Sequence, residues 1–203
     1  MRKIGIMGGT FNPVHNGHLL IAENARSQLF LDEVRFIPNG APPHKTDADI
    51  ESGEHRLRMV ALAIEGNPAF VADDRELREK RVSYSCLTLQ ELHEEFPGDA
   101  LIFIMGGDSL RDFKTWYHPE IICKYATLAA AVRDECDRDQ LSDYAKELRR
   151  LYGADVQLIQ TPNLSVSSSS LRKRVRMKET IRYQVPENVR VYISENQLYT
   201  ENR

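Results

Sequence analysis

Short apolar runs alternate with longer stretches of helical periodicity along most of the chain. The apolar runs predict strands near Lys3–Met7, Val34–Ile37, Phe70–Ala72, Ala100–Met105, Thr127–Val132 and Val156–Gln160. The periodic stretches predict helices near Gly17–Leu29, Gly53–Glu65, Ser85–Glu95, Pro119–Lys124, Asp139–Tyr152, Ser167–Met177 and Pro186–Gln197. Strands that alternate with helices in this way are typical of βαβ units. We therefore expect an α/β fold, a parallel sheet with helices on both faces, and a small helical C-terminal segment from about residue 165.

The composition fits one globular domain. Of the 203 residues, 41% are apolar and 28% charged, which is enough for one full core, so we expect a single domain over residues 1–203. The formal net charge of −3 gives no positive field for nucleic acid or anionic membranes, and no run approaches the roughly 18 apolar residues of a membrane span. The three cysteines form no CxxC pair and favour neither a disulfide framework nor a cysteine zinc site. We expect a cytoplasmic protein with no nucleic-acid or membrane partner.

The junction between the first strand and the first helix carries the most informative residues. It reads GGTFNPVHNGH from Gly8 to His18 and lies at the carboxyl end of a predicted strand, where open α/β sheets bind ligands. The two glycines let backbone N–H groups approach a phosphate, and the positive end of the following helix faces the same place. His15 and His18 are three residues apart, so in a helix that begins near Gly17 both can donate hydrogen bonds to that anion.

The same junction also allows plainer interpretations. The glycines can simply form a turn, and a single histidine is usually a surface or core residue, although the combination is less expected by chance. The absence of GxGxxG and of a following Gly-Lys-Ser/Thr argues against dinucleotide and Walker A loops. A zinc site of the HExxH type needs a glutamate where Asn16 stands.

A second candidate for anion binding lies near residue 170. The serines Ser167–Ser170 precede a stretch with five basic residues up to Lys178. Hydroxyls and unpaired N–H groups at a helix start, followed by cations, can hold an anion, and Ser168, Arg172 and Arg176 share one helix face. A serine cap on a solvated basic helix is the plainer alternative. An RNA-binding helix is disfavoured because aromatic residues do not interleave with the basic ones.

Three further candidates stand in loops or at strand ends. Lys45 lies in Gly40–Ser52, a segment too long for a tight turn, and a solvated loop lysine is the alternative. Gly106 and Asp108 follow the most apolar predicted strand, where the carboxylate can accept hydrogen bonds from ribose hydroxyls or cap a helix. Trp116, the single tryptophan, can stack on a planar ring or pack in the core.

Taken together, these blocks resemble the bacterial nicotinate-nucleotide adenylyltransferases of the nucleotidylyltransferase superfamily. His15-Asn16-Gly17-His18 matches the (H/T)xGH signature of that superfamily. The other matching blocks are Pro42-Pro43-His44-Lys45, His55-Arg56-Leu57-Arg58-Met59, Ser83-Tyr84-Ser85, Met105-Gly106-Gly107-Asp108-Ser109 and Val166-Ser167-Ser168-Ser169-Ser170-Leu171-Arg172. The resemblance runs to Leu198-Tyr199 and implies a Rossmann-like fold of nucleotidylyltransferase type. Asn12 departs from it, because many relatives have Asp there.

The resemblance also implies a reaction and assigns residues to it. ATP and nicotinate mononucleotide give nicotinate adenine dinucleotide and pyrophosphate in NAD biosynthesis, with Mg²⁺ bound mainly through the ATP phosphates and no metal ligand from the chain. The implied catalytic residues are His15, His18, Lys45 and Arg172. The implied ATP-binding residues are Gly8, Gly9, Thr10, Phe11, His15, His18, Lys45, Gly106, Asp108, Ser167, Ser168, Ser169 and Arg172. The implied nicotinate mononucleotide-binding residues are Thr10, Ser83, Tyr84, Ser85, Asp108, Trp116 and Tyr117.

Competing functions differ from this one in testable ways. A phosphopantetheine adenylyltransferase, or another member of the superfamily, shares the nucleotide blocks, and Ser83–Ser85 and Trp116 argue against it. A class I aminoacyl-tRNA synthetase has the same signature, but 203 residues leave no room for tRNA-binding domains. A nucleotide-binding sensor keeps Gly8, Gly9 and Arg172 without needing the histidine pair. The sequence leaves open the preference for acid or amide mononucleotide and the oligomeric state, a homo-oligomer included.

Overall fold

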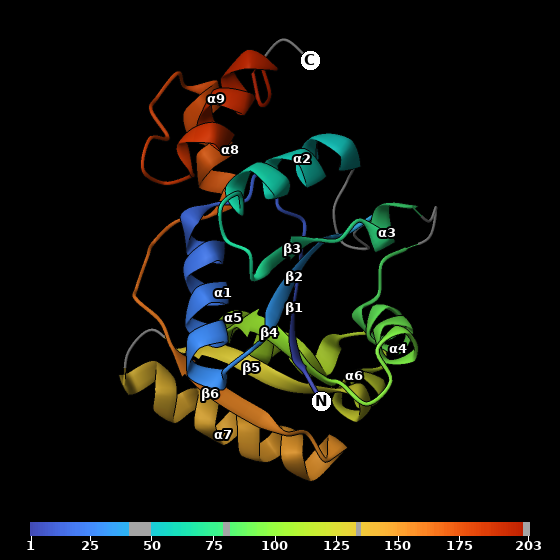
Figure 1. Cartoon of the computed structure of the whole chain (residues 1–203). Coiled ribbons are helices and arrows are strands. Elements are labelled where there is room, and N and C mark those ends of the chain that lie inside the picture. The colour runs from blue at the N-terminus through green and yellow to red at the C-terminus, as the bar shows by residue number, and fades with distance from the viewer. Residues whose placement is uncertain (41–49, 79–81, 133–134, 201–203) are drawn as a thin grey trace. The chain divides into compact units, whose positions relative to one another are not determined.

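The strands form one parallel sheet of Rossmann-like order. The computed structural model describes residues 1–40, 50–78, 82–132 and 135–200 (Figure 1). Its strands, in the order β3-β2-β1-β4-β5-β6, have the bounds β1 Lys3–Gly9, β2 Glu33–Pro38, β3 Phe70–Ala72, β4 Ala100–Gly106, β5 Ala126–Val132 and β6 Val156–Gln160. The register places Ile6 opposite Phe103 in the β1–β4 pair and Phe103 opposite Leu128 in the β4–β5 pair. The strand order reverses between β1 and β4, the switch point at which such sheets bind ligands. The predicted fold class and strand positions are confirmed.

The helices follow the prediction closely, with three additions. Those predicted are observed as α1 Asn16–Leu29, α2 Gly53–Ala63, α4 Ser85–Glu95, α6 Pro119–Tyr125, α7 Glu135–Tyr152, α8 Ser168–Arg176 and α9 Glu187–Glu195. The additions are α3 Arg75–Arg78, α5 Gly107–Asp112 and the 3-10 turn Phe113–Thr115. Each addition spans fewer than two turns, so it shows no helical periodicity in the sequence.

Contacts within the chain group into two compact units, each of which is built from three segments. Unit 1 consists of Met1–Gly8, Leu20–Arg35 and Ser83–Asn163, and unit 2 of Gly9–Leu19, Phe36–Val82 and Leu164–Arg203. Three of the boundaries fall within β1, α1 and β2, and neither unit is a continuous stretch of sequence. The single domain expected from composition stays a prediction.

Unit 1 is built around the apolar strands β4 and β5. Its core side chains include Ile4, Ile6, Val34, Leu101, Phe103, Ile104, Leu128, Val132, Leu141, Leu148 and Ile159. Helices α4, α5, α6 and α7 pack against these strands, and the long α7 runs along β5 and β6 (Figure 1). Burial on both faces explains why β4 and β5 read as continuous apolar runs.

Unit 2 contains α2, α8 and α9 together with the loop that follows β1. Its core side chains include Phe11, Val14, Phe36, Ile37, Met59, Val60, Leu171, Ile181, Val189, Ile193 and Leu198. Helix α9 packs against α2 (Figure 1), and His55 Nδ1 and Tyr192 Oη hydrogen-bond across this contact at 2.9 Å. In the described parts of the chain, no helix combines the length and apolar character needed to cross a membrane.

Candidate active site

The first carbonyl of the loop after β1, that of Thr10, accepts a hydrogen bond from the buried Arg56. Arg56 of α2 is 2% exposed, and its guanidinium donates to the carbonyl oxygens of Thr10 (3.0 Å), Glu51 (3.0 Å) and Gly40 (3.4 Å). Burial lowers the pKa of Arg56, but a guanidinium stays charged because its ordinary pKa is so high. Arg56 therefore ties the start of the loop to two other segments of unit 2.

Two side chains of α8 hold the next carbonyls of the same loop. Ser168 Oγ donates to the Pro13 carbonyl at 2.8 Å, and Arg172 Nη1 donates to the Asn12 carbonyl at 2.9 Å. The Nε atom of Arg172 is buried and has no hydrogen-bond partner among the described residues. The loop and the serine-arginine block, which lie far apart in the sequence, are thus in contact within one unit.

The start of α8 is a capping box, as its serines suggested. Ser167 Oγ accepts the backbone N–H of Ser170 at 3.2 Å, and Ser170 Oγ accepts the backbone N–H of Ser167 at 3.4 Å. Ser169 Oγ lies 3.2 Å from Ser167 Oγ on the exposed side of this turn. Capping and contact with the loop therefore coexist in one turn, with different serines serving each purpose.

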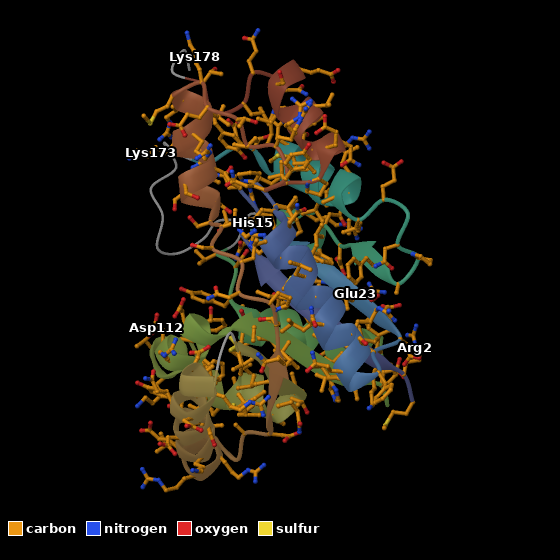
Figure 2. The ribbon with its side chains drawn as sticks, turned by 90° about the vertical axis from the view of Figure 1, so that its left-hand side faces the viewer. Arg2, His15, Glu23, Asp112, Lys173 and Lys178 are labelled. Carbon is orange, nitrogen blue, oxygen red and sulfur yellow. The ribbon has the colours of Figure 1, made fainter. Side chains whose placement is uncertain are left out.

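The basic stretch that follows the serines is divided between the loop and solvent. Arg172 reaches the loop, whereas Figure 2 shows Lys173 on α8 and Lys178 beyond the C-terminal end of this helix, both away from His15. Arg174 donates to the carbonyl of Thr180 at 2.9 Å. Arg172 of this stretch therefore contacts the loop, whereas Arg174 bonds to the segment that follows α8.

His15 and His18 form a stacked pair at the start of α1. Their ring centroids are 3.7 Å apart with 22° between the planes, and the ring of Phe11 packs edge-on against His18 at 5.1 Å. His18 Nδ1 accepts the backbone N–H of His15 at 3.2 Å, which places the proton of a neutral His18 ring on Nε2. His15 Nδ1 is buried and, among the residues described, lacks a hydrogen-bond partner.

The two imidazoles are neutral at physiological pH. Burial lowers the pKa of His15 to about 4. Burial, followed by the proximity of His15, lowers the pKa of His18 well below its ordinary value. A neutral pair stacks without charge repulsion, and each ring still has one N–H group to donate. The histidines can therefore serve as directional donors, not as cations.

The glycines of the loop have unequal steric roles. A Cβ atom on Gly17 would lie 3.0 Å from both His15 Nδ1 and His15 Cε1 and 3.3 Å from Val166 Cγ1. A Cβ atom on Gly9 would lie 3.1 Å from the ring of Phe11. At Gly8 the nearest neighbour of an added Cβ would be the Phe103 ring at 4.0 Å, an ordinary contact. Packing thus accounts for glycine at positions 17 and 9, and not at position 8.

Unit 1 contains the candidates that follow β4. Gly106 ends the strand and is the N-cap residue of α5, whereas Asp108 lies inside the helix, so the alternative role of Asp108 as a helix cap is wrong. The Asp108 carboxylate is 75% exposed and accepts a hydrogen bond from Arg111 Nη1 at 2.8 Å. Arg111 Nη2 contacts Asp137, so one guanidinium joins two carboxylates. Asp108 is accessible and is oriented by its own helix.

The aromatic candidates of unit 1 lie beside one another. The ring centroids of Tyr84 and Tyr117 are 4.3 Å apart. Ser83 and Ser85 are the sequence neighbours of Tyr84, and Ser85 is the first residue of α4. Trp116 is half-buried, with its ring edge-on against Phe103 at 5.9 Å and tilted against Phe113 at 5.5 Å. Trp116 therefore packs against Phe103 and Phe113 while remaining partly exposed, and its stacking on a planar ring stays a prediction.

Two residues that contact the loop carry little signal in the sequence. Arg56 stands out there only as part of a matching block, and Tyr199 has no predicted role, although both contact the loop. The predicted site residue Lys45 falls outside the described residues. Within the described ranges, no group of three or more His, Cys, Asp or Glu side chains could hold a metal ion.

Comparison with known proteins gives a consistent set of similarities. The profile of the cytidylyltransferase-like family matches residues 6–174. The chain is 44% identical over 199 residues to a Lachnoclostridium phytofermentans protein described as "Probable nicotinate-nucleotide adenylyltransferase", covering 98% of this chain and 100% of that protein. A Desulfitobacterium hafniense protein with the same description is 40% identical over 201 residues, covering 98% and 96%. The Plasmodium falciparum nicotinic acid mononucleotide adenylyltransferase complexed with NaAD has a TM-score of 0.78 at 19% identity, covering 98% of each chain.

Proposed function

The chain belongs to the cytidylyltransferase-like family, and from this membership we propose that it transfers the adenylyl group of ATP to nicotinate mononucleotide. The products are nicotinate adenine dinucleotide and pyrophosphate, and the step belongs to NAD biosynthesis. A 5′-phosphate oxygen of the acceptor attacks the α-phosphorus of ATP, and the bond to the bridging oxygen of pyrophosphate breaks. The acceptor phosphate is already anionic at neutral pH, so the reaction needs neither a general base nor a covalent intermediate.

The contact between α8 and the histidine loop is the observation that carries this proposal. Ser168 and Arg172 donate to the loop that leads into the stacked histidines, so donor groups suited to phosphate surround one short segment. His15 Nδ1 and Arg172 Nε are both buried without a partner among the described residues. Burying such atoms unpaired costs about 1–3 kcal/mol each, so they mark places where phosphate oxygens or water complete the hydrogen bonding.

The residues of unit 2 would act by alignment and hydrogen bonding. We assign His18 Nε2–H and the His15 imidazole to the α-phosphate, where charge develops as the bridging bond breaks. Arg172, with Lys45, is assigned to the departing pyrophosphate. Holding two polyanions in line can contribute about 7–11 kcal/mol to lowering the barrier. The remaining ATP contacts are assigned to Gly8, Gly9, Thr10, Phe11, Gly106, Asp108, Ser167, Ser168 and Ser169.

The acceptor residues are proposed on the aromatic cluster of unit 1. Backbone N–H groups around Tyr84-Ser85 and Tyr117 are assigned to the nicotinate carboxylate, which neutral amides can bind without a buried cation. The short distance between the Tyr84 and Tyr117 rings supports this grouping. The accessible part of Trp116 is assigned to stacking on the pyridine ring. The assigned acceptor set also includes Thr10, Ser83 and Asp108.

Enzymes of this family use a divalent metal ion together with ATP. Because the described side chains form no cluster of ligands, they do not fit a resident metal site. We therefore assign Mg²⁺ to the ATP phosphates and water, the ligands that this ion commonly keeps in nucleotide sites. A cytoplasmic location is part of the proposal and is supported by Cys86 and Cys123, which are free thiols.

Pyrophosphate release from ATP with three acceptors in parallel tests the proposed function. The acceptors are nicotinate mononucleotide, its amide counterpart and phosphopantetheine. We expect release with nicotinate mononucleotide and none with phosphopantetheine, and the ratio between the first two acceptors measures the acid preference. Turnover confined to phosphopantetheine would replace the proposed acceptor. ATP binding without turnover of any acceptor would favour a nucleotide sensor.

A further inference from the structure

The C-terminal segment of unit 2 makes a buried hydrogen bond to the loop that precedes the histidines. Tyr199 Oη donates to Asn12 Oδ1 at 2.9 Å, with Tyr199 6% and Asn12 2% exposed. The same amide oxygen accepts the backbone N–H of Glu51 at 3.2 Å, and Glu51 Oε1 accepts the backbone N–H of Tyr199 at 3.3 Å. Burial raises the pKa of the Tyr199 hydroxyl, so this group stays a proton donor at physiological pH.

The backbone around Tyr199 adopts uncommon conformations that accompany this buried ring. After α9 ends at Glu195, Gln197 has a φ of 51° and Tyr199 a φ of 64°, both in the left-handed region. Between them, Leu198 is fully buried and donates its N–H to the Ile193 carbonyl at 3.0 Å. Left-handed residues other than glycine persist where the surroundings fix them. The contacts of this segment therefore hold Tyr199 in one defined position.

A short series of contacts leads from Asn12 to the imidazoles. Phe11 precedes Asn12 and has a φ of 49°, also left-handed, with its side chain 2% exposed. The Phe11 ring lies edge-on against His18, which in turn stacks on His15. Because Asn12 is held through its side chain by Tyr199 and through its carbonyl by Arg172, it fixes one side of this strained residue. The Phe11 side chain links Asn12 to the His18 ring, so a displacement of Asn12 would also displace the imidazole pair.

We propose that Tyr199 is a positioning residue for adenylyl transfer: its hydroxyl holds Asn12 and, through Asn12 and Phe11, sets the orientation of the His18 imidazole. The proposal rests on the function proposed above. Tyr199 acts through the loop and contacts neither reacting group. A purely structural role would change the free energy of unfolding and leave kcat of the folded protein unaltered, so the two roles can be separated.

Tyr199→Phe tests this proposal, with Tyr192→Phe as the matched control. Both substitutions delete one hydroxyl from unit 2, and each hydroxyl makes a 2.9 Å hydrogen bond, but Tyr192 bonds to His55 on α2 instead of to the loop. We expect Tyr199→Phe to lower kcat about tenfold while KM for ATP changes less than about twofold. Tyr192→Phe should leave both constants within about twofold of the wild type. Thermal unfolding of both variants gives their loss of stability.

Substitutions at Asn12 test the same hydrogen bond from its acceptor side. Asn12→Ala should lower kcat as Tyr199→Phe does, and the double variant should lie within about twofold of Asn12→Ala alone, because both changes remove one interaction. Asn12→Asp keeps an acceptor oxygen and should retain kcat within about threefold. Should Tyr199→Phe fail to fold, the contrast between Asn12→Ala and Asn12→Asp decides the proposal by the same criteria.

Imidazole NMR provides a readout that does not need turnover. In protein labelled with ¹⁵N-histidine, the side-chain resonances of His15 and His18 should shift in Tyr199→Phe, while those of His93 and His118 in unit 1 stay in place. If the wild type transfers no adenylyl group, the proposed function fails, and the NMR spectra alone decide whether Tyr199 orients the rings. Unchanged His15 and His18 resonances, or a loss of kcat shared equally by Tyr192→Phe, would overturn the proposal.

Discussion

Replacing Gly17 with alanine adds a methyl group beside the stacked histidines. The new Cβ atom would lie 3.0 Å from two atoms of the His15 ring and 3.3 Å from Val166 Cγ1, whereas ordinary contacts begin near 3.4 Å. The His15 ring must therefore move by about 0.4 Å, the difference between 3.4 and 3.0 Å. Because this ring stacks on His18 at 3.7 Å, the movement changes the geometry of the pair.

The expected effects on stability and on catalysis differ in size. Alanine is favoured over glycine by up to about 1 kcal/mol inside a helix, and Gly17 lies in the first turn of α1, so this gain offsets part of the steric cost. We expect the free energy of unfolding to change by less than about 1 kcal/mol. A misplacement of about 1 Å can lower a rate about 100-fold, so on a logarithmic scale 0.4 Å corresponds to roughly a sixfold loss of kcat.

Pyrophosphate release at saturating substrates measures this loss, and urea denaturation measures stability. Ser27→Ala is a suitable control, because it places alanine at an exposed site of the same helix, away from the histidines. Gly17→Val should lower kcat further, since its larger side chain displaces His15 more. A Gly17→Ala variant with wild-type kcat would show that the position of His15 does not limit the reaction.

Four other predictions follow from the same contacts. His18→Ala should lower kcat by roughly 10²–10³ at saturating substrates, as expected for loss of one preorganised donor. Because the pKa of His15 falls from 6.5 to about 4 on folding, the unfolded chain binds the extra proton, so the contribution of His15 to the free energy of unfolding should fall by about 3 kcal/mol as the pH drops from about 6.5 to 4. His18, whose pKa burial also lowers, adds a fall of the same sign, and His15→Gln should flatten the slope in urea titrations. Arg56→Lys cannot reach three carbonyls and should cost about 2–4 kcal/mol of stability, whereas Arg58→Lys at an exposed site should cost less than about 0.5 kcal/mol. A chelator should stop pyrophosphate release without changing the melting temperature of the ligand-free protein, because the described residues offer no metal cluster.

The parts of the fold that the sequence predicts well are those with strong local patterns. Strands β4 and β5 are continuous apolar runs, and their observed bounds differ from the prediction by one residue at one end. Helix α5 escaped prediction because its six residues begin with glycine and complete fewer than two turns. Such a short helix depends on tertiary contacts, here with α7, which the local sequence does not encode.

The same distinction between local patterns and distant contacts applies to the candidate site. The histidines stand within four residues of each other, and local spacing was enough to expect them together. The contacts that hold their loop come from residues 46 to 187 positions away: Arg56 on Thr10, Ser168 on Pro13, Arg172 on Asn12 and Tyr199 on Asn12. Three of the four end on backbone carbonyls. Every residue has a carbonyl group, so the identity of the acceptor residue leaves no trace of such contacts in the sequence.

Burial of the histidines decides the charge state in which they can donate hydrogen bonds. The sequence predicts His15 and His18 as hydrogen-bond donors without fixing their charge, and burial lowers the pKa of both rings and leaves them neutral. A cation attracts ATP and pyrophosphate in every state of the reaction, whereas a neutral N–H group contributes mainly where its direction matches a developing charge. In the proposed function, permanent positive charge therefore comes from Arg172 and Lys45, and the imidazoles distinguish the transition state by orientation. That division makes the rigidity of the loop, more than its charge, the property on which the rate depends.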